Sequence, residues 1–408
     1  MKKINTILAI FLSGIILIGC DGLEKKLEFQ PTVLPIPTDE NITPSLATQI
    51  NKSIDRGVEF LIKTQNKNGT WGTAGNVKGL NILTPVPSGH DNYQFGCTAL
   101  CVQALIDANS KLSGAKKALE KGERWILQNA AKIKRSSREV LYNNWAHAYC
   151  IEALVKMYKR SRGNKARRKR IFDEVSNQVR LLEMYQTSYG GWAYYYSLPG
   201  LRTIYSSPTS FTTATCLIAL KRAESIGVKI PKRVVKRALS VIIKLRNPNF
   251  TYAYDTRFLL SRNGTASKIN ASLGRAQVCN LAARLWGDKR VTDQILERWA
   301  DRLVRRNLWL SRGRKTPKPH ESYFNIAGYY YYYGHYYAYE CLEEMPVNVR
   351  RKYQARLARI IISHQGRDDG SWWDFPVFNY GKYFGTPFSI MCLSKCRSDE
   401  VFKTKSKK

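Results

Sequence analysis

The sequence predicts an all-α protein in which six inner and six outer helices form an (α/α)6 toroid. Two observations predict this fold: six nearly all-apolar segments share a Cys at one register position, and six amphipathic segments alternate with them. A third is that no segment of useful length shows the period-two alternation of a β-strand. Stacked helical hairpins either continue as a solenoid or close into a ring, and six pairs suit a closed ring.

The predicted inner helices are apolar on almost all sides, which is typical of buried helices. Because Cys is small and is often buried, its fixed position in each segment predicts a packing role. A ring would hold most of these thiols apart, although Cys97 with Cys101, and Cys392 with Cys396, lie one helical turn apart and stay open as metal ligands. The repeated Cys residues are Cys101, Cys150, Cys216, Cys279, Cys341 and Cys392.

The predicted outer helices each have one apolar face and one face rich in Lys and Arg. Ile171, Val175 and Val179 share an apolar face, whereas Lys232 and Arg233 belong to the basic face of a later segment. The six outer segments lie near 46–64, 115–128, 168–184, 232–246, 291–307 and 347–364.

Three outer segments are followed by a similar turn that begins with Gln and ends in Gly-x-Trp, at residues 65–71, 186–192 and 365–372. Gly permits a tight turn after a helix. The Gln amide can bond the exposed backbone at the start of a neighbouring helix, and the Trp can pack between repeats. We therefore expect these turns to join successive helical pairs.

These turns resemble the QW motif of squalene–hopene cyclases and the prenyltransferase and squalene oxidase repeats of the terpene cyclase/protein prenyltransferase superfamily. The resemblance covers roughly residues 45–397 and implies the toroid fold. The sequence lacks the DxDD motif, the DDxxD motif and the zinc-binding segment of these families, and Asp368-Asp369 lies inside the third turn. The resemblance therefore implies a divergent member, and it does not supply the families' chemistry.

The first residues have the pattern of a lipoprotein signal. Lys2 and Lys3 precede an apolar stretch, residues 4–18, that is short for a membrane span. It ends before Cys20, which we expect to carry acyl chains such as palmitate after cleavage. We predict a signal peptide at 1–19, a lipid-anchored Cys with a Pro-rich linker at 20–44, and the toroid at 45–408. The predicted location is the cell envelope, at the periplasmic face of a membrane or the cell surface.

The charge is strongly positive, with 66 Lys and Arg against 31 Asp and Glu, a formal net charge of +35. Such a charge favours anionic partners. The chain contains two dense basic clusters, at 132–135 and 167–170. The export signal argues against nucleic acid, which leaves acidic lipid headgroups and anionic glycans as expected partners.

Polar and aromatic residues gather at the N-terminal ends of the predicted inner helices, where a ring would open onto its lumen. His335, Tyr333, His147 and Asp91 are the candidate catalytic residues, since Tyr and His can move protons. Asp374 precedes the sixth inner helix on the same rim. No cofactor and no metal-ligand set is predicted. The expected lining of the ligand cavity comprises His90, Tyr93, Asn144, Thr213, Arg275, Tyr332, Lys382, Tyr383 and Trp373.

These observations favour a lipid-anchored envelope protein whose toroid binds or modifies an isoprenoid or other lipid in an aromatic central cavity. An enzyme and a non-catalytic binder both fit this description. Two alternatives stay open: a non-catalytic binding or scaffold lipoprotein, and an enzyme or binder for anionic polysaccharide. A lyase would need a cationic group to hold a uronate, and Arg275 could provide it.

Overall fold

A computed structural model of the chain describes residues 42–72, 87–135, 140–194, 206–259, 269–312, 314, 330–374 and 380–397. Every helix discussed below belongs to the compact unit Pro37–Lys408. The predicted signal peptide, Cys20 and most of the predicted linker lie outside the described residues. Within the described residues, no helix combines the length and the apolar character needed to cross a bilayer.

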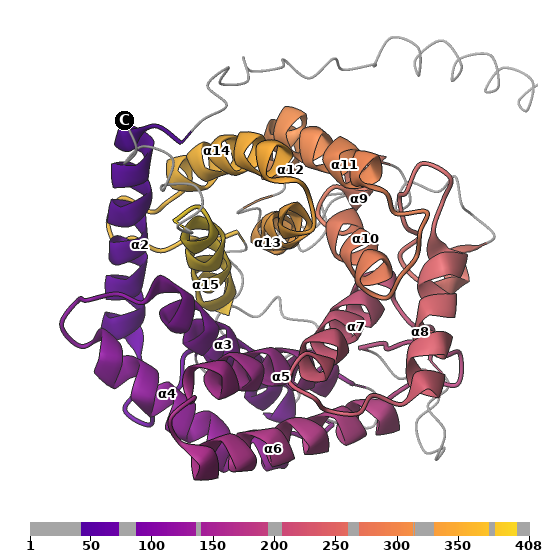
Figure 1. Cartoon of the computed structure of the whole chain (residues 1–408), viewed down its shortest axis with the longest axis horizontal. Helices are drawn as coiled ribbons and strands as arrows, with labels where there is room; N and C mark the ends of the chain where they lie inside the picture. The colour runs from indigo at the N-terminus through magenta and orange to yellow at the C-terminus, as the bar shows by residue number, and fades with distance from the viewer. Residues whose placement is uncertain are drawn as a thin grey trace, which may run out of the picture. The chain divides into compact units, whose positions relative to one another are not determined.

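The described helices form two concentric rings (Figure 1). Each inner helix packs on the next, and the last inner helix packs on the first, so the ring is closed. The inner helices are α3 (Pro87–Ala108), α5 (Asn143–Arg160), α7 (Ser210–Glu224), α10 (Ala276–Leu285), α13 (Tyr331–Glu343) and α15 (Tyr380–Lys395). The outer helices are α2 (Pro44–Thr64), α4 (Ala115–Asn129), α6 (Lys165–Met184), α8 (Lys232–Leu245), α11 (Asp293–Arg305) and α14 (Val347–Ser363). The predicted α/α toroid is confirmed.

Short elements connect the two rings. They are the helices α9 (Ile269–Ser272) and α12 (Asn307–Arg312), and the 3₁₀ turns η1 (Ala130–Lys132) and η2 (Thr256–Leu259). Two isolated bridges are the only β-pairing among the described residues.

The repeated Cys residues lie in the packed layer of the inner ring. All eight Cys residues of the described chain are free and buried. Burial raises the pKa of each thiol, that of Cys279 to about 12, so the thiols stay protonated and unreactive near neutral pH. Within the described residues, no three His, Cys, Asp or Glu side chains converge as metal ligands. These observations support packing as the role of the Cys register.

The three Gln-to-Trp turns share one set of hydrogen bonds. In the second turn, Gln186 Nε2 donates to the carbonyl of Gly190 at 2.7 Å and to that of Val234, on the next outer helix, at 2.9 Å. The indole of Trp192 donates to the Leu182 carbonyl at 2.8 Å. The same bonds recur at Gln65 and at Gln365. Each turn therefore joins its own outer helix to the following one.

Glycine is required in these turns for two reasons. Gly190 has φ +102°, a left-handed conformation that other residues rarely adopt. A Cβ at Gly190 would also lie 2.9 Å from the carbonyl oxygen of Arg237. The backbone of the turn at Gly190 consequently packs directly against the backbone of the next outer helix, with no side chain between them.

A fourth turn of the same shape follows α8, although its sequence lacks the Gln, Gly and Trp of the other three turns. Arg246 stands where the other turns have Gln, Phe250 where they have Gly, and Tyr252 where they have Trp. Phe250 adopts φ +61°, and Asn247 N–H donates to the Thr251 carbonyl at 2.9 Å, as Asn66 does to Thr70 in the first turn. This turn is a degenerate copy of the motif.

The third turn closes the outer ring. Gln365 Nε2 donates to the Ser53 carbonyl at 2.9 Å, and Arg56 donates to the carbonyls of Gly366 and Arg367 at 2.8 Å and 2.6 Å. Ser53 and Arg56 belong to α2, the first outer helix. The last and first outer helices are therefore joined in the same way as α2 is joined to α4 and α6 to α8.

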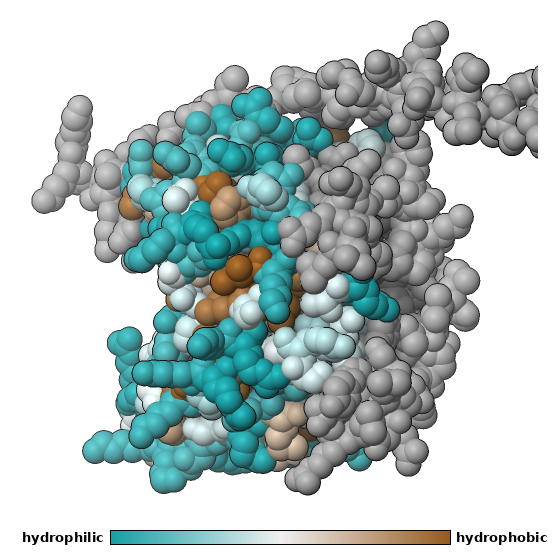
Figure 2. All heavy atoms as spheres, turned by 90° about the vertical axis from the view of Figure 1, so that its right-hand side faces the viewer, coloured by the Kyte–Doolittle hydropathy of each residue, from teal (hydrophilic) through white to brown (hydrophobic). Residues whose placement is uncertain are grey.

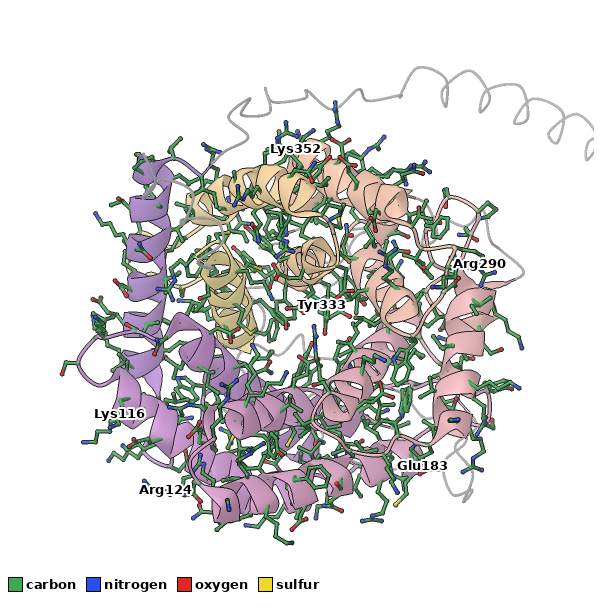
Figure 3. All side chains as sticks on the ribbon, in the orientation of Figure 1. Lys116, Arg124, Glu183, Arg290, Tyr333 and Lys352 are labelled. Atoms are coloured by element: carbon green, nitrogen blue, oxygen red, sulfur yellow. The ribbon has the colours of Figure 1, made fainter. Side chains whose placement is uncertain are left out.

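The outward faces of the outer helices are polar. In the side view of Figure 2, hydrophilic side chains cover most of the described surface, and apolar atoms show only between them. Lys116, Arg124 and Arg290 lie on the outer rim in Figure 3, whereas Tyr333 lies near the axis of the ring. The positive charge predicted for the exterior is thus spread around the ring.

Candidate functional site in the lumen of the ring

Aromatic side chains from four inner helices meet at the axis of the toroid. Trp145 of α5 lies 5.9 Å from Phe211 of α7 and 6.0 Å from Tyr333 of α13, measured between ring centroids. Tyr333 lies 6.2 Å from Phe388 of α15. Trp145 and Tyr149 are four residues apart and so share the lumen-facing side of α5. We call these five side chains the lumen aromatic cluster.

Tyr333 occupies the centre of this cluster. Its hydroxyl shares a 2.9 Å hydrogen bond with Thr215 and lies 3.4 Å from the Phe211 carbonyl, to which it donates. Burial raises the pKa of Tyr333 well above its ordinary value of 10. The phenol is therefore protonated at neutral pH and acts as a hydrogen-bond donor.

Arg275 lies beside the same cluster at the start of α10. Its guanidinium carbon lies 5.2 Å from the Tyr254 ring centroid, 5.9 Å from that of Phe211 and 6.0 Å from that of Tyr330. The side chain is almost fully buried. A guanidinium held against ring faces combines cation–π attraction with a positive charge at the N-terminal end of the lumen.

The opposite end of the lumen carries charges from the last turns of the inner helices. Asp107 of α3 accepts from Lys156 of α5 at 2.5 Å. Glu340 of α13 pairs with Arg222 of α7 and with Lys395 of α15, the latter at 2.9 Å. These five residues form a lumen charge cluster that joins five of the six inner helices at their C-terminal ends.

Glu152 lies between the aromatic and the charged cluster on the same face of α5. It is buried, and its Oε1 has no hydrogen-bond partner among the described residues. Burial raises the pKa of Glu152 to about 7, and nearby Arg222 opposes this rise. A carboxyl group that is half protonated near neutral pH can donate or accept a proton.

A second buried carboxyl lies at the N-terminal end of the lumen. Asp374 Oδ2 lies 3.4 Å from the backbone N–H of Tyr332, which donates to it. Burial raises the pKa of Asp374 to about 7, against this hydrogen bond and the positive charge of Arg314. Two buried carboxyl groups of raised pKa therefore lie at different levels of the ring.

Both candidate histidines point away from the lumen, into the layer between the rings. His147 Nδ1 lies 2.6 Å from Gln178 Oε1 on the outer helix α6. His335 Nε2 lies 2.8 Å from the Asn307 amide, and its Nδ1 lies 2.7 Å from the Tyr331 carbonyl. Burial lowers the pKa of each imidazole to about 4, so both are neutral. The structure does not bring either histidine to Tyr333.

Some other predicted site residues hold the rim together. Asn144 donates to the Ala193 carbonyl at 2.5 Å, and the Thr213 hydroxyl accepts from the Trp192 backbone N–H at 3.0 Å. Tyr93 packs on Tyr142 with ring centroids 5.0 Å apart. These contacts indicate that the three residues stabilise the packing at the N-terminal ends of the inner helices.

The first and sixth inner helices carry the remaining predicted residues. Asp91 is exposed and His90 is buried, with its pKa lowered by burial. Lys382 pairs with Asp369 at 2.6 Å and lies 5.2 Å from the Trp373 ring centroid. The Tyr383 ring stacks on Phe60 of α2 at 5.7 Å, and the Tyr332 ring meets that of Tyr331 at 5.0 Å. Of the predicted lining, Arg275 lies against the lumen aromatic cluster; of the candidate catalytic residues, Tyr333 belongs to that cluster.

Glu152 and the lumen charge cluster were not among the residues predicted from the sequence. The sequence does contain a signal for these residues. Charged side chains near the C-terminal ends of otherwise apolar helices need charged or polar partners when they are buried. Trp145, Tyr149, Glu152 and Lys156 are spaced by four, three and four residues, which places them on one face of α5.

No family model matches the sequence, and no characterised protein sequence matches it. Solved structures do match. The α-1,6-mannanase GH76A of Salegentibacter sp. HEL1_6 is 12% identical over 85% of this chain and 98% of its own, with a TM-score of 0.53. Cellobiose 2-epimerase from Bacillus thermoamylovorans is 11% identical over 86% of this chain and 100% of its own, with a TM-score of 0.53.

A type II terpene cyclase from Scytonema is 14% identical over 86% of this chain and 99% of its own, with a TM-score of 0.47. At such low identity, the matches to the mannanase and the epimerase show the fold alone. The chain has the α/α toroid fold that the mannanase and the epimerase also have. Function has to be argued from its own residues.

Proposed function

We propose that this protein is a lipid-anchored envelope protein whose toroid binds an isoprenoid or other lipid at the N-terminal end of its lumen. The observation that carries the proposal is the lumen aromatic cluster, in which rings from four inner helices converge on the axis. Aromatic side chains provide large apolar contact areas, and ligand pockets are lined mainly by such residues with a few polar groups.

The polar groups beside the cluster suit an amphiphilic ligand. Trp145 is only partly buried, so its ring offers surface to a ligand. Arg275 adds a positive charge close to Phe211 of the cluster. An apolar chain against the rings and a polar or anionic end near Arg275 would use both features. Anchoring at Cys20 would keep the toroid close to a source of such molecules.

The test uses the full-length chain purified in detergent. The protein is incubated with a lipid extract of the host membrane, repurified and extracted, and the bound lipid is identified by mass spectrometry. We expect one lipid class near stoichiometric amount, strongly reduced in Trp145→Leu. Trp125→Leu is the matched control, because Trp125 is a partly buried Trp of the outer helix α4. Absence of lipid from the wild type, or equal loss in both variants, contradicts the proposal.

A second candidate is binding or cleavage of an anionic polysaccharide. Arg275 among three aromatic rings favours it, because sugar rings stack on aromatic faces and a uronate carboxylate pairs with a guanidinium. Two solved structures that share the fold are a mannanase and a cellobiose epimerase. Binding of oligogalacturonate to a lipid-free protein, abolished by Arg275→Gln and unaffected by Trp125→Leu, would replace the lipid proposal with this one.

A further inference from the structure

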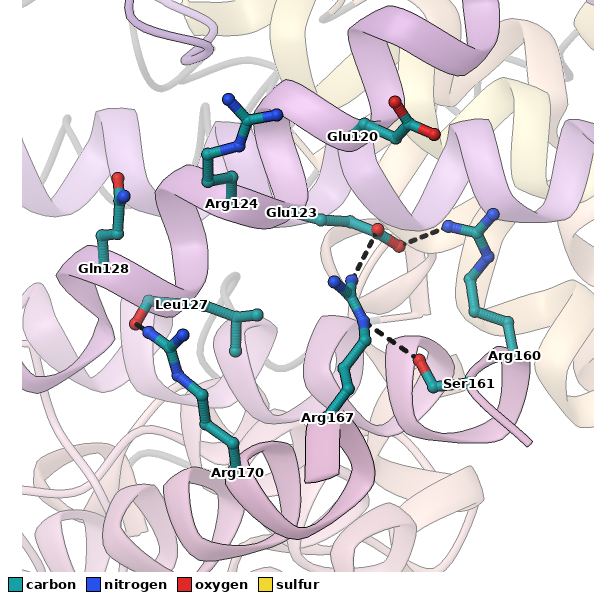
Figure 4. A pocket seen from close by; sticks show the side chains of 9 residues that line it. All are labelled: Glu120, Glu123, Arg124, Leu127, Gln128, Arg160, Ser161, Arg167 and Arg170. Atoms are coloured by element: carbon teal, nitrogen blue, oxygen red, sulfur yellow. Dashed lines mark hydrogen bonds and ion pairs between the residues drawn. The ribbon is translucent and has the colours of Figure 1, made fainter. Parts of the chain in front are cut away.

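A separate pocket lies on the outside of the ring, remote from the lumen residues described above. It has a volume of about 480 Å³ and lies between α4 and α6, with the end of α5 closing one side (Figure 4). Four arginines line it, Arg124, Arg160, Arg167 and Arg170, and they outnumber its two glutamates. We call it the arginine pocket.

Two of the arginines are fixed by a buried carboxylate. Glu123 of α4 accepts from Arg160 at 2.6 Å and from Arg167 at 2.7 Å, with one carboxylate oxygen for each (Figure 4). The Glu123 side chain is only 4% exposed. Arg167 also donates to the Ser161 hydroxyl at 3.1 Å. The two guanidinium groups are therefore held in place before any ligand arrives, which lowers the entropy cost of binding.

The other two arginines retain most of their donors. Arg170 donates once, to the Leu127 carbonyl at 3.1 Å, and is exposed. Arg124 is exposed and makes no hydrogen bond or ion pair with the part of the chain that the structure describes. Five N–H donors per guanidinium, in a fixed fork, suit the oxygens of a phosphate group.

The pocket also lies beside the N-terminus of α6. This helix has 20 residues, has no acidic side chain in its first turn, and is capped by Asn164, which accepts from the Arg167 backbone N–H. The positive end of the helix dipole adds to the four guanidinium charges. Long-range attraction from a net charge of +35 would bring anions to the surface.

We propose that the arginine pocket binds a phosphate group carried by a small anion or a lipid headgroup. Arg124 and Arg170 would close on the phosphate oxygens from α4 and α6, while Glu123 keeps Arg160 and Arg167 in position. A phosphate monoester carries close to two negative charges at neutral pH, which matches the excess of two positive charges in the lining. This site is independent of the ligand proposed for the lumen.

The test measures binding by isothermal titration calorimetry at constant ionic strength, with the full-length protein in a nonionic detergent. The probes are inorganic phosphate and short-chain dihexanoyl phosphatidic acid. We expect Arg124→Gln with Arg170→Gln to weaken binding by at least about tenfold, since each lost charged hydrogen bond is worth roughly that factor. Both positions are exposed, and thermal unfolding should confirm that the fold is intact.

Two further double variants distinguish binding in the arginine pocket from non-specific attraction of anions to the positively charged surface. Lys232→Gln with Lys236→Gln removes the same charge from exposed positions on α8 and should leave affinity within about twofold. Arg124→Lys with Arg170→Lys keeps the positive charges but replaces each planar guanidinium, with its forked N–H donors, by an ammonium group. This pair of substitutions should weaken binding several-fold. Equal weakening by the α8 pair, or full affinity in the Lys pair, overturns the proposal, as does failure of both probes to bind. Tighter binding of phosphatidic acid identifies a lipid headgroup as the source, and equal affinity identifies the phosphate group itself.

Discussion

Replacing Glu152 by Gln should change how the stability of the toroid depends on pH. Burial raises the pKa of Glu152 from 4.5 to about 7 in the folded protein. The folded protein therefore holds a proton that the unfolded chain releases above pH 4.5. The stabilising contribution is fully present below pH 4.5 and is lost as the pH rises to about 7. A shift of this size corresponds to about 3 kcal/mol.

Four other buried groups have pKa values that burial shifts toward the same pH range. Asp374, whose pKa is raised to about 7, acts in the same direction as Glu152. His147 and His335, whose pKa values are lowered to about 4, and His90, whose pKa is also lowered, act in the opposite direction, because the unfolded chain binds the protons that these residues exclude. The Glu152→Gln variant lacks the Glu152 contribution alone, so its unfolding free energy should gain about 1.4 kcal/mol per pH unit relative to the wild type between pH 4.5 and 7.

The assay is urea unfolding followed by circular dichroism at half-unit steps from pH 4.5 to 8. Between pH 4.5 and 7, Glu152→Gln should become steadily more stable relative to the wild type. Glu59→Gln is the control, because Glu59 is exposed on α2 and should follow the wild type. Parallel curves for the wild type and Glu152→Gln would show that Glu152 is already ionised in the fold and would refute the reasoning.

Three further substitutions test local features by chemical denaturation. Gly190→Ala should cost at least about 2 kcal/mol, because it places a Cβ at φ +102° and 2.9 Å from a carbonyl oxygen; Gly163→Ala, where a Cβ would meet nothing, should cost little. At Phe250, with φ +61°, the Gly variant should be more stable than the Ala variant by roughly 1 kcal/mol, and the opposite order would exclude strain there. Tyr333→Phe should cost about 1 kcal/mol by removing the bond to Thr215, and no loss would show that this bond is dispensable.

The fold could be predicted because the repeats carry redundant local signals. The outer segment expected near 115–128 is α4 (Ala115–Asn129), and that expected near 347–364 is α14 (Val347–Ser363). The Gln-to-Trp turns mark where outer helices end, since their hydrogen bonds require those residue types. The turn after α8 escaped prediction because Arg246, Phe250 and Tyr252 replace all three marker residues.

The site was harder to predict for a physical reason. A helix that is apolar on all sides gives no hydrophobic periodicity, so the sequence does not show which face meets the lumen and which meets the outer ring. His147 and His335 illustrate this, because both face the outer layer although the sequence analysis expected them to be catalytic residues at the lumen. Glu152 shows the converse error: it is a buried acid that faces the lumen, in a segment that the sequence indicated to be apolar on all sides.

The closure of the ring also has a kinetic consequence. The bond from Gln365 to Ser53 spans 312 positions of sequence, and the bonds from Arg56 to the same turn span 310 and 311. Contacts of such high sequence separation form late, because a long loop must close first. The docking of the last turn on the first outer helix should therefore belong to the final step of folding, after the neighbouring repeats have packed on one another.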